Sequence, residues 1–299
     1  MHPPTIFEQI FGGDVHTLRT FCRRVSNILI GIIPVKRWRT AVRNKIDDVI
    51  IMLNQSKIEY FLQNYPKTYS EDETIKRVVE RGLSIARFGD GEFNMCIGRH
   101  KSFQKYDEEL VARMKEVLVS CNEKILIGIN TLEGHELSPI WKKFVIRRGN
   151  RVLRLLNNNR QYDSSTITTN FPSDPAEFKE RIEQLKKIWD GRKVVFVVGK
   201  DSRFFFEKEL FSNILAYEFV YAPAKNAYAE YQRIINDVRY YDKEWLIMSS
   251  LGPTATILSY ELALEGYQAI DLGQTPSKYR LAKYGHRYPA DHPMYNNHQ

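Results

Sequence analysis

Short β-prone runs alternate with helical segments from Ser70 to Leu272, and this alternation restricts the fold more than any other feature of the chain. The predicted strands are Leu83–Phe88, Lys124–Ile129, Lys193–Val198, Tyr217–Tyr221, Trp245–Ser249 and Gln268–Leu272. Helices are predicted between most of them, at Glu108–Val119, Pro175–Trp189, Asn226–Tyr240 and Thr254–Glu265. The pattern indicates an α/β domain, a mostly parallel sheet with helices on both faces. Such sheets bind ligands at the carboxyl ends of their strands, so the loops after each strand are where a site is expected.

The chain is expected to have three parts. Ser70 and Glu73 have the spacing of a capping box, which predicts a helix through Val79 that ends at Gly82. We therefore expect a helical N-terminal segment at residues 1–65 and the α/β domain at residues 66–275. At residues 276–299 the hydrophobic pattern fades and Tyr, His, Lys and Pro take over, which predicts a C-terminal tail or lid.

The positive charge of the chain is concentrated near the N-terminus. The net charge is +8, and residues 14–54 hold eight Lys or Arg against three Asp or Glu. After Pro34, apolar residues recur every three or four positions up to Leu53, so one apolar stripe runs between basic faces. This pattern is typical of a helix on an anionic membrane surface, and equally of a helix that packs on the main domain. No nucleic-acid-binding motif accompanies the segment, so nucleic acid is not an expected partner.

Cysteine usage and hydropathy indicate the compartment. The three cysteines are odd in number and form no Cys-x-x-Cys pair, which argues against a disulfide framework and a zinc knuckle. The most apolar N-terminal run, residues 28–33, is six residues long, whereas a membrane-spanning helix needs roughly 20. No signal-peptide pattern is present. We expect a cytoplasmic protein, held peripherally on the inner face of the cell membrane if residues 14–54 bind lipid.

The loop after the first predicted strand contains two carboxylates between glycines. In an extended backbone, positions i and i+2 project to the same side, so Asp90 and Glu92 can converge on one hard cation, while Gly89 and Gly91 permit close approach of a ligand. Mg²⁺ or Mn²⁺ binds in this way and takes its other ligands from water and a substrate diphosphate. The alternative is a turn in which Asp90 bonds its own backbone and Glu92 caps the next segment. Arg87 fits either interpretation, as an ion-pair partner for Asp90 or as a phosphate ligand.

Two further loops offer positive charge. Lys200 and Arg203 follow the apolar run 194–198 and are suited to neutralising a diphosphate. Gly252 and Thr254 stand where a helix begins after the strand Trp245–Ser249. Free N–H groups at a helix N-terminus carry about half an elementary charge and bind phosphate readily, although the same residues also suit a simple capped turn.

Taken in order, these loops resemble the GT-D type bacterial glycosyltransferases. The similar blocks are residues 84–92, 103–107, 199–203, 222–227, 249–256 and 266–273, and together they span roughly residues 70–275. The resemblance implies a Rossmann-like domain that binds a UDP-sugar and a divalent metal through the Asp-x-Glu pair, here Asp90 and Glu92. It also places Arg203, Asn226 and Thr254 in the donor pocket. Residues 274–279 depart from the family, which tends to have a His and an acidic segment there, so the acceptor and the catalytic base stay unassigned.

The sequence therefore predicts a hexosyltransferase that moves sugar from a nucleotide-sugar donor to a glycan acceptor, with Mn²⁺ or Mg²⁺ as cofactor. The expected setting is bacterial surface polysaccharide assembly, such as capsule or lipopolysaccharide, or glycoprotein glycan assembly. Asp90 and Glu92 are the expected metal ligands and catalytic residues. The expected donor-binding residues are Arg87, Gly89, Gly91, Lys200, Arg203, Asn226, Gly252 and Thr254. Two alternatives stay open: a metal-dependent phosphohydrolase, and a catalytically silent sugar-nucleotide or membrane-binding subunit of a polysaccharide assembly complex.

Overall fold

The computed structural model describes residues 36–99, 103–132 and 137–285 and divides the chain into two compact units. The first unit comprises residues 1–63 and 137–149, and the second comprises residues 64–136 and 150–299. The first unit thus takes in a segment from beyond residue 65, the predicted end of the N-terminal part. No described helix combines the length and the apolar character that crossing a membrane requires.

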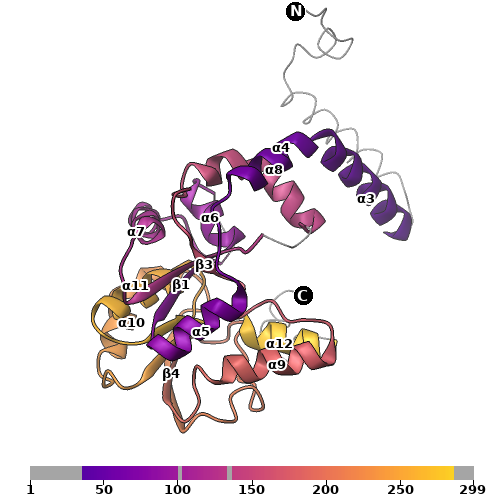
Figure 1. Cartoon of the computed structure of the whole chain (residues 1–299). Helices are drawn as coiled ribbons and strands as arrows, with labels where there is room; N and C mark the ends of the chain where they lie inside the picture. Colours follow the sequence, from indigo (N-terminus) through magenta and orange to yellow (C-terminus); the bar gives the residue numbers. More distant parts are fainter. Residues whose placement is uncertain (1–35, 100–102, 133–136, 286–299) are drawn as a thin grey trace, which may run out of the picture. The chain divides into compact units, whose positions relative to one another are not determined.

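The first unit is built from α3 (Lys36–Leu53), α4 (Gln55–Asn64) and most of α8 (Pro139–Leu153) (Figure 1). Lys143 on α8 forms an ion pair with Asp47 on α3, with 2.6 Å between Nζ and Oδ2. Gly149 lets the α8 backbone approach the buried ring of Phe61, since a Cβ there would lie 2.9 Å from Cδ2 of that ring. Glycine is therefore required at this contact. Residues 14–35 of the basic segment lie outside the described residues.

The second unit contains a seven-stranded parallel sheet with the order β3-β2-β1-β7-β6-β4-β5. All six predicted strands are confirmed, with ends that differ by no more than one residue. The seventh, β3, has two residues and carries no hydrophobic run for the sequence to reveal. The strands are β1 (Ser84–Phe88), β2 (Ile125–Ile129), β3 (Asp163–Ser164), β4 (Lys193–Gly199), β5 (Ala216–Ala222), β6 (Leu246–Ser250) and β7 (Ala269–Asp271).

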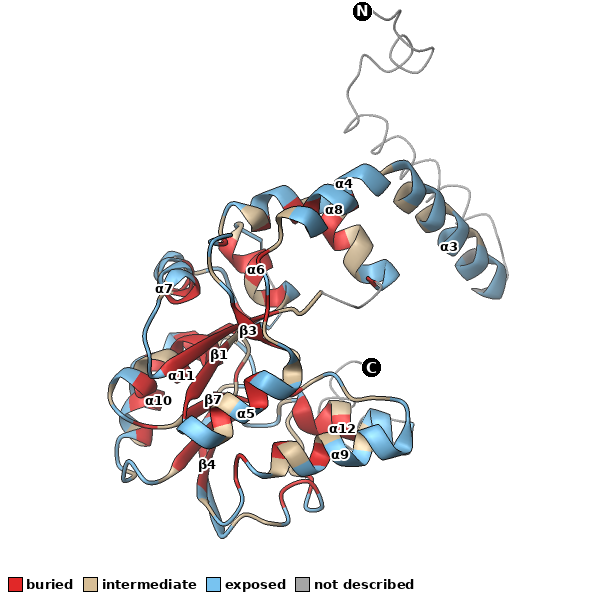
Figure 2. Cartoon of the chain, viewed as in Figure 1, coloured by how far each residue is buried: buried red, intermediate tan, exposed pale blue. Residues whose placement is uncertain are grey.

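Helices cover both faces of this sheet. One face carries α5, α9 and α12, whose apolar side chains join a core cluster with alternate residues of the strands, such as Ile85, Phe196 and Met248. The other face is covered by α7, α10 and α11 (Figure 1), and the inner strands are almost wholly buried (Figure 2), whereas the edge strand β5 is largely exposed. The helices are α5 (Glu71–Arg81), α6 (Asp90–Cys96), α7 (Glu108–Val119), α9 (Pro175–Lys186), the 3₁₀ turn η1 (Ala227–Glu230), α10 (Tyr231–Val238), α11 (Pro253–Leu264) and α12 (Thr275–Tyr284).

Capping chemistry sets two of the helix boundaries. The predicted capping box of α5 is present, since the Ser70 hydroxyl accepts from the Glu73 N–H at 3.2 Å and a Glu73 carboxylate oxygen accepts from the Ser70 N–H at 2.9 Å. Gly82 ends the helix in the left-handed conformation, with φ 60°. At the other end of the chain, the expected tail or lid is helical up to Tyr284. Tyr279 is buried in the core cluster, and this contact holds α12 on the sheet although its sequence is mostly polar.

Candidate functional site

The acidic loop after β1 is the first turn of helix α6. Gly89 is the N-cap, and a Glu92 carboxylate oxygen accepts its N–H at 3.0 Å. The extended backbone expected for Asp90 and Glu92 is therefore wrong, because residues two apart in a helix point about 200° away from each other. Asp90 is exposed, whereas Glu92 is half-buried and directed back toward the strand end. The capping role foreseen for Glu92 is present, and it leaves its second carboxylate oxygen for other contacts.

Arg87 holds two strands and a loop together. Its Nε donates to the Asp271 carbonyl at 2.6 Å, and one terminal nitrogen donates to the Ser165 carbonyl at 2.7 Å. The other terminal nitrogen lies 3.3 Å from the Asp271 carboxylate, so the ion-pair partner of Arg87 is Asp271 and not Asp90. Only 11% of the Arg87 side chain is exposed. Gly273 makes room for this guanidinium, since a Cβ at that position would lie 1.8 Å from it.

Half-buried Glu92 and buried Asp271 form an acidic pair at the end of β1 and β7. Burial raises the pKa of Glu92, and the negative charge of Asp271 raises it further. Burial also raises the pKa of Asp271, although Arg87 opposes the shift. Two carboxyl groups thus share one guanidinium, and a cation placed beside them would stabilise their ionised forms.

The donor set fits a divalent metal that shares its coordination with substrate. Across the described residues, no group of three or more His, Cys, Asp or Glu side chains is arranged to hold a metal by itself. Mg²⁺ does not need such a group, because it is bound by one or two carboxylates plus water and phosphate oxygens. Glu92 provides one partly free carboxylate beside the under-compensated Asp271, and exposed Asp90 opens the same helix.

A second cluster joins the ends of β5 and β6 through a residue that the sequence did not single out. Gln104 is buried, and its amide nitrogen donates to the Asn226 side chain at 2.8 Å. Its amide oxygen accepts from the Thr254 hydroxyl at 3.4 Å. Asn226 has φ 58°, and its backbone N–H donates to the Phe103 carbonyl at 2.7 Å. Asn226 and Thr254, both predicted donor-binding residues, are thus brought together. Only the position of Gln104 in a family block could have indicated it.

The start of α11 has the geometry of an anion-binding turn. Gly252 is the N-cap with φ 59° and ψ −137°, a conformation that favours glycine, and Pro253 follows at the first helical position. A Cβ on Gly252 would lie 2.5 Å from the Phe103 ring, so this ring rests against the turn. The N-terminal N–H groups of α11 face the carboxyl edge of the sheet, where helix termini bind phosphate.

Lys200 and Arg203 lie in the loop after β4, and both side chains are exposed. The loop is fixed at its start by the Lys200 N–H, which donates to the Ala222 carbonyl at 2.8 Å. Because β1, β7, β6 and β4 are consecutive in the sheet, their four loops lie at one edge over about 14 Å, at about 4.8 Å between strands. Among the described residues, strand order alone places these two cations at the same edge as the other clusters.

Comparisons with known proteins agree with this arrangement. A family model described as the glycosyltransferase GT-D fold matches residues 85–295. Over 238 residues the chain is 29% identical to glycosyltransferase GlyD of Streptococcus pneumoniae serotype 4, covering 74% of this chain and 29% of that protein. Over 240 residues it is 30% identical to a probable glycosyl transferase Gly of Streptococcus gordonii, covering 75% of this chain and 35% of that protein. The chain thus spans about a third of the length of these curated relatives.

Solved structures also match. A structure reported as showing that the domain of unknown function 1792 has a distinct glycosyltransferase fold is 25% identical, with a TM-score of 0.73 over 81% of this chain and 92% of that chain. A structure described as a new glycosyltransferase (DUF1792) from Streptococcus sanguinis is 26% identical, with a TM-score of 0.69 over 76% of this chain and 91% of that chain.

Proposed function

Because the chain belongs to the family of glycosyltransferases with the GT-D fold, we propose that it transfers a sugar from a nucleotide-sugar donor, a UDP-sugar, to a glycan acceptor with the help of Mn²⁺ or Mg²⁺. The observation that carries the proposal is the acidic Glu92–Asp271 pair beside Arg87, at the carboxyl end of β1 and β7. The two carboxyl groups, when ionised, carry more negative charge than the single guanidinium of Arg87 neutralises, and they lie at the edge where parallel sheets bind ligands.

Each part of the edge has a role in this reaction. Glu92 and the neighbouring Asp271 would hold the metal, which when bound stabilises the charge that develops on the departing diphosphate, while Asp90 stands exposed at the start of the same helix. Arg87 fixes Asp271 and the end of β1. Half-buried Gly89 and buried Gly91 begin α6 without side chains and would let the donor approach its backbone. In the transfer, the bond from the anomeric carbon to the diphosphate breaks. A bond to the acceptor oxygen forms, the acceptor loses its proton, and the nucleoside diphosphate leaves.

The diphosphate would be bound by groups that carry positive charge before the reaction begins. The N-terminus of α11, with Gly252 and Thr254, offers backbone N–H donors, and Lys200 and Arg203 add two cationic side chains. Donors that are already oriented need no rearrangement as charge develops, which is why such sites accelerate transfer. Asn226 shapes the same edge through its bond to Gln104.

The decisive test replaces Glu92 with Gln and uses Glu73→Gln as a matched control. Both glutamates accept an N-cap N–H at the same place in their helices, at 3.0 Å for Glu92 and 2.9 Å for Glu73. A loss of stability or activity that is caused only by a weaker helix cap should therefore occur in both variants. We expect Glu92→Gln to lose sugar transfer by about 10²-fold or more and to need more Mn²⁺, while Glu73→Gln keeps wild-type activity.

The assay separates the alternatives. Release of nucleoside diphosphate that depends on an acceptor supports transfer, and EDTA should abolish it until Mn²⁺ is restored. Acceptor-independent hydrolysis at the same rate would identify a phosphohydrolase. Donor binding without turnover on any acceptor would identify a silent binding subunit. Full activity of Glu92→Gln at wild-type metal concentrations would refute the assignment of Glu92.

We also propose that α3 attaches the protein peripherally to an anionic membrane. Trp38, Met52 and Leu53 on this helix expose about two thirds of their surface, at 65%, 67% and 68%. Arg43 and Lys45 are exposed on the same helix. Apolar side chains inserted at the headgroup boundary, with basic residues beside anionic lipid, are how amphipathic helices bind a bilayer surface. A location on the cytoplasmic face would place the enzyme where nucleotide sugars and membrane-bound acceptors meet.

A further inference from the structure

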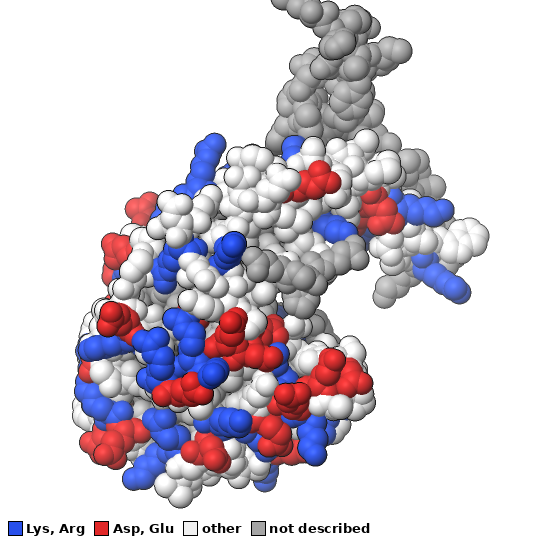
Figure 3. All heavy atoms as spheres, in the orientation of Figure 1, with Lys and Arg blue, Asp and Glu red and all other residues white. Residues whose placement is uncertain are grey.

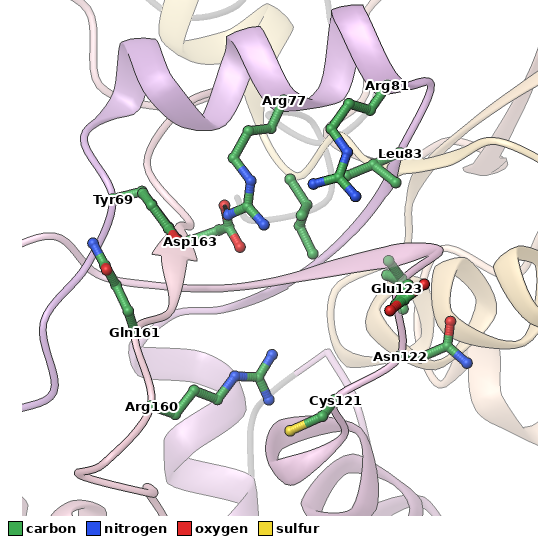
Figure 4. A pocket seen from close by; sticks show the side chains of 12 residues that line it. Tyr69, Arg77, Arg81, Leu83, Cys121, Asn122, Glu123, Arg160, Gln161 and Asp163 are labelled. Carbon is green, nitrogen blue, oxygen red and sulfur yellow. Dashed lines mark hydrogen bonds and ion pairs between the residues drawn. The ribbon is translucent and has the colours of Figure 1, made fainter.

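A pocket of about 340 Å³ lies beneath α5 (Figure 4). Its lining comes from α5, from the segments that lead into β1 and β2, and from the segment before β3. Leu83 lines it and directly precedes β1, whereas the candidate donor site follows Phe88 at the other end of that strand. Asp163, at the other end of the lining, lies in the register row of Gly128 and Arg87, two strands or about 10 Å from Arg87. None of the lining residues belongs to the candidate donor site.

Three arginines converge on this pocket. Arg77 and Arg81 lie one turn apart at the end of α5, and Figure 4 shows both guanidinium groups directed from the helix into the pocket. Arg160 extends into it from the opposite side, in the segment before β3. All three arginines lower the pKa of Asp163, so all three act on the same small volume. The acidic residues of the lining are Asp163 and the exposed Glu123.

Two of the three guanidinium groups are held in place by the protein. Arg77 forms an ion pair with Asp163 and lies over the Tyr69 ring at 4.3 Å. Arg160 donates to the Ser120 carbonyl and lies over the ring of the residue two positions on, Tyr162, at 4.6 Å. Arg81 is exposed and makes no hydrogen bond or ion pair with the described residues. The pocket thus combines two oriented guanidinium groups with a third whose donors stay available.

We propose that this arginine pocket, formed by Arg77, Arg81 and Arg160, binds a phosphate group, either free or as a phosphomonoester. Guanidinium groups hold phosphate oxygens through paired N–H bonds, and several of them around one cavity give the geometry that a dianion needs. The volume equals that of roughly eleven water molecules, which leaves room for a small organic portion. Acidic and basic side chains are interspersed over the face that carries α5 (Figure 3), so attraction by a uniformly basic surface does not account for the site.

Binding is tested on the full chain with inorganic phosphate and with a hexose phosphate, at constant ionic strength set by sodium chloride. A ligand that binds the native state raises its melting temperature in a saturable way, and calorimetry gives the dissociation constant. Loss of one charge-assisted contact should weaken binding by about tenfold or more in Arg81→Gln. Lys76→Gln, an exposed change on the same helix outside the lining, should keep wild-type affinity. Tighter binding of the hexose phosphate would identify a phosphomonoester, and equal binding would identify free phosphate.

The reactivity of the Cys121 thiol reports whether the ligand is bound in this pocket. This thiol lines the pocket and is exposed, whereas Cys96 is buried. Phosphate should slow its alkylation by neutral iodoacetamide, followed by peptide mass spectrometry, and the protection should vanish in Arg81→Gln. Three results would overturn the proposal: no phosphate effect beyond chloride, equal loss in Lys76→Gln, or loss in a Lys200→Gln/Arg203→Gln variant instead. The last would place the phosphate in the donor site.

Discussion

Replacing Gly273 with Ala should disconnect the ion pair at the centre of the candidate site. Gly273 has φ 57°, in the left-handed region where a side chain costs about 1 kcal/mol. The new Cβ would lie 1.8 Å from a terminal nitrogen of Arg87, which is far inside van der Waals contact. This terminal nitrogen must therefore move, and its ion pair with the Asp271 carboxylate would be broken.

The structure sets the size of the effect. Breaking a buried ion pair by removal of one partner costs about 3–5 kcal/mol, because the remaining charge is left uncompensated. Asp271 is that remaining charge, and it is 4% exposed. Together with the backbone cost, we expect Gly273→Ala to lower the free energy of unfolding by about 4–6 kcal/mol and to lower transfer activity with it.

Gly82→Ala is the matched control, since Gly82 has φ 60° and a Cβ there would meet nothing within 4 Å. It should lose about 1 kcal/mol in urea unfolding. A second comparison uses the Arg87→Ala background, where adding Gly273→Ala should cost only about 1 kcal/mol more. Equal losses for the two glycine variants, or an unchanged cost of Gly273→Ala without Arg87, would refute the reasoning.

Two further predictions concern Asp163 and α3. Burial raises the pKa of Asp163 from 3.8 to about 6 despite the neighbouring Arg77. Because this folded value lies above the unfolded one, the ionised form is destabilising. Relative to Asp163→Asn, the wild-type free energy of unfolding should fall by about 2 kcal/mol from about pH 4.5 to about pH 8, and a difference that is constant with pH in urea unfolding would contradict this. Trp38→Glu/Met52→Glu should abolish sedimentation with phosphatidylserine vesicles, whereas Tyr240→Glu, exposed in the second unit, should not; equal retention of all variants would exclude α3 as the lipid contact.

The strands were predictable because each is a short hydrophobic run closed by turn residues. The run Val194–Val198 is wholly buried, as parallel strands covered on both faces are. Strand β3 was not predictable, since two polar residues, Asp163 and Ser164, become a strand only through pairing with β2. Sheet order is likewise set by contacts between distant segments. Helix α8 was not predicted from the sequence, because five basic residues interrupt the regular spacing of its apolar residues.

The sequence predicts which loops carry the candidate site, but it does not predict the local geometry of those loops. Glycine at the N-cap of α6 gives no side-chain signal for a helix start, so residues 89–92 were interpreted as extended. Asp271 lies 184 residues from Arg87, and no spacing in the sequence relates them. The contacts of Gln104 could not be predicted for the same reason, because its partners Asn226 and Thr254 are 122 and 150 residues away in the sequence. Partners of this kind are fixed by the tertiary fold alone.

Strand order also determines how charge is laid out along the carboxyl edge. Negative charge lies at β1 and β7, with Glu92 and Asp271, while positive potential lies at β6 and β4, with the α11 N-terminus and Lys200. A metal–diphosphate pair has the complementary order, since its cation needs carboxylates and its phosphates need N–H donors and cations. On the proposed function the diphosphate therefore extends from β7 toward β4. The transferred sugar and the acceptor then belong near the start of α6, where exposed Asp90 stands.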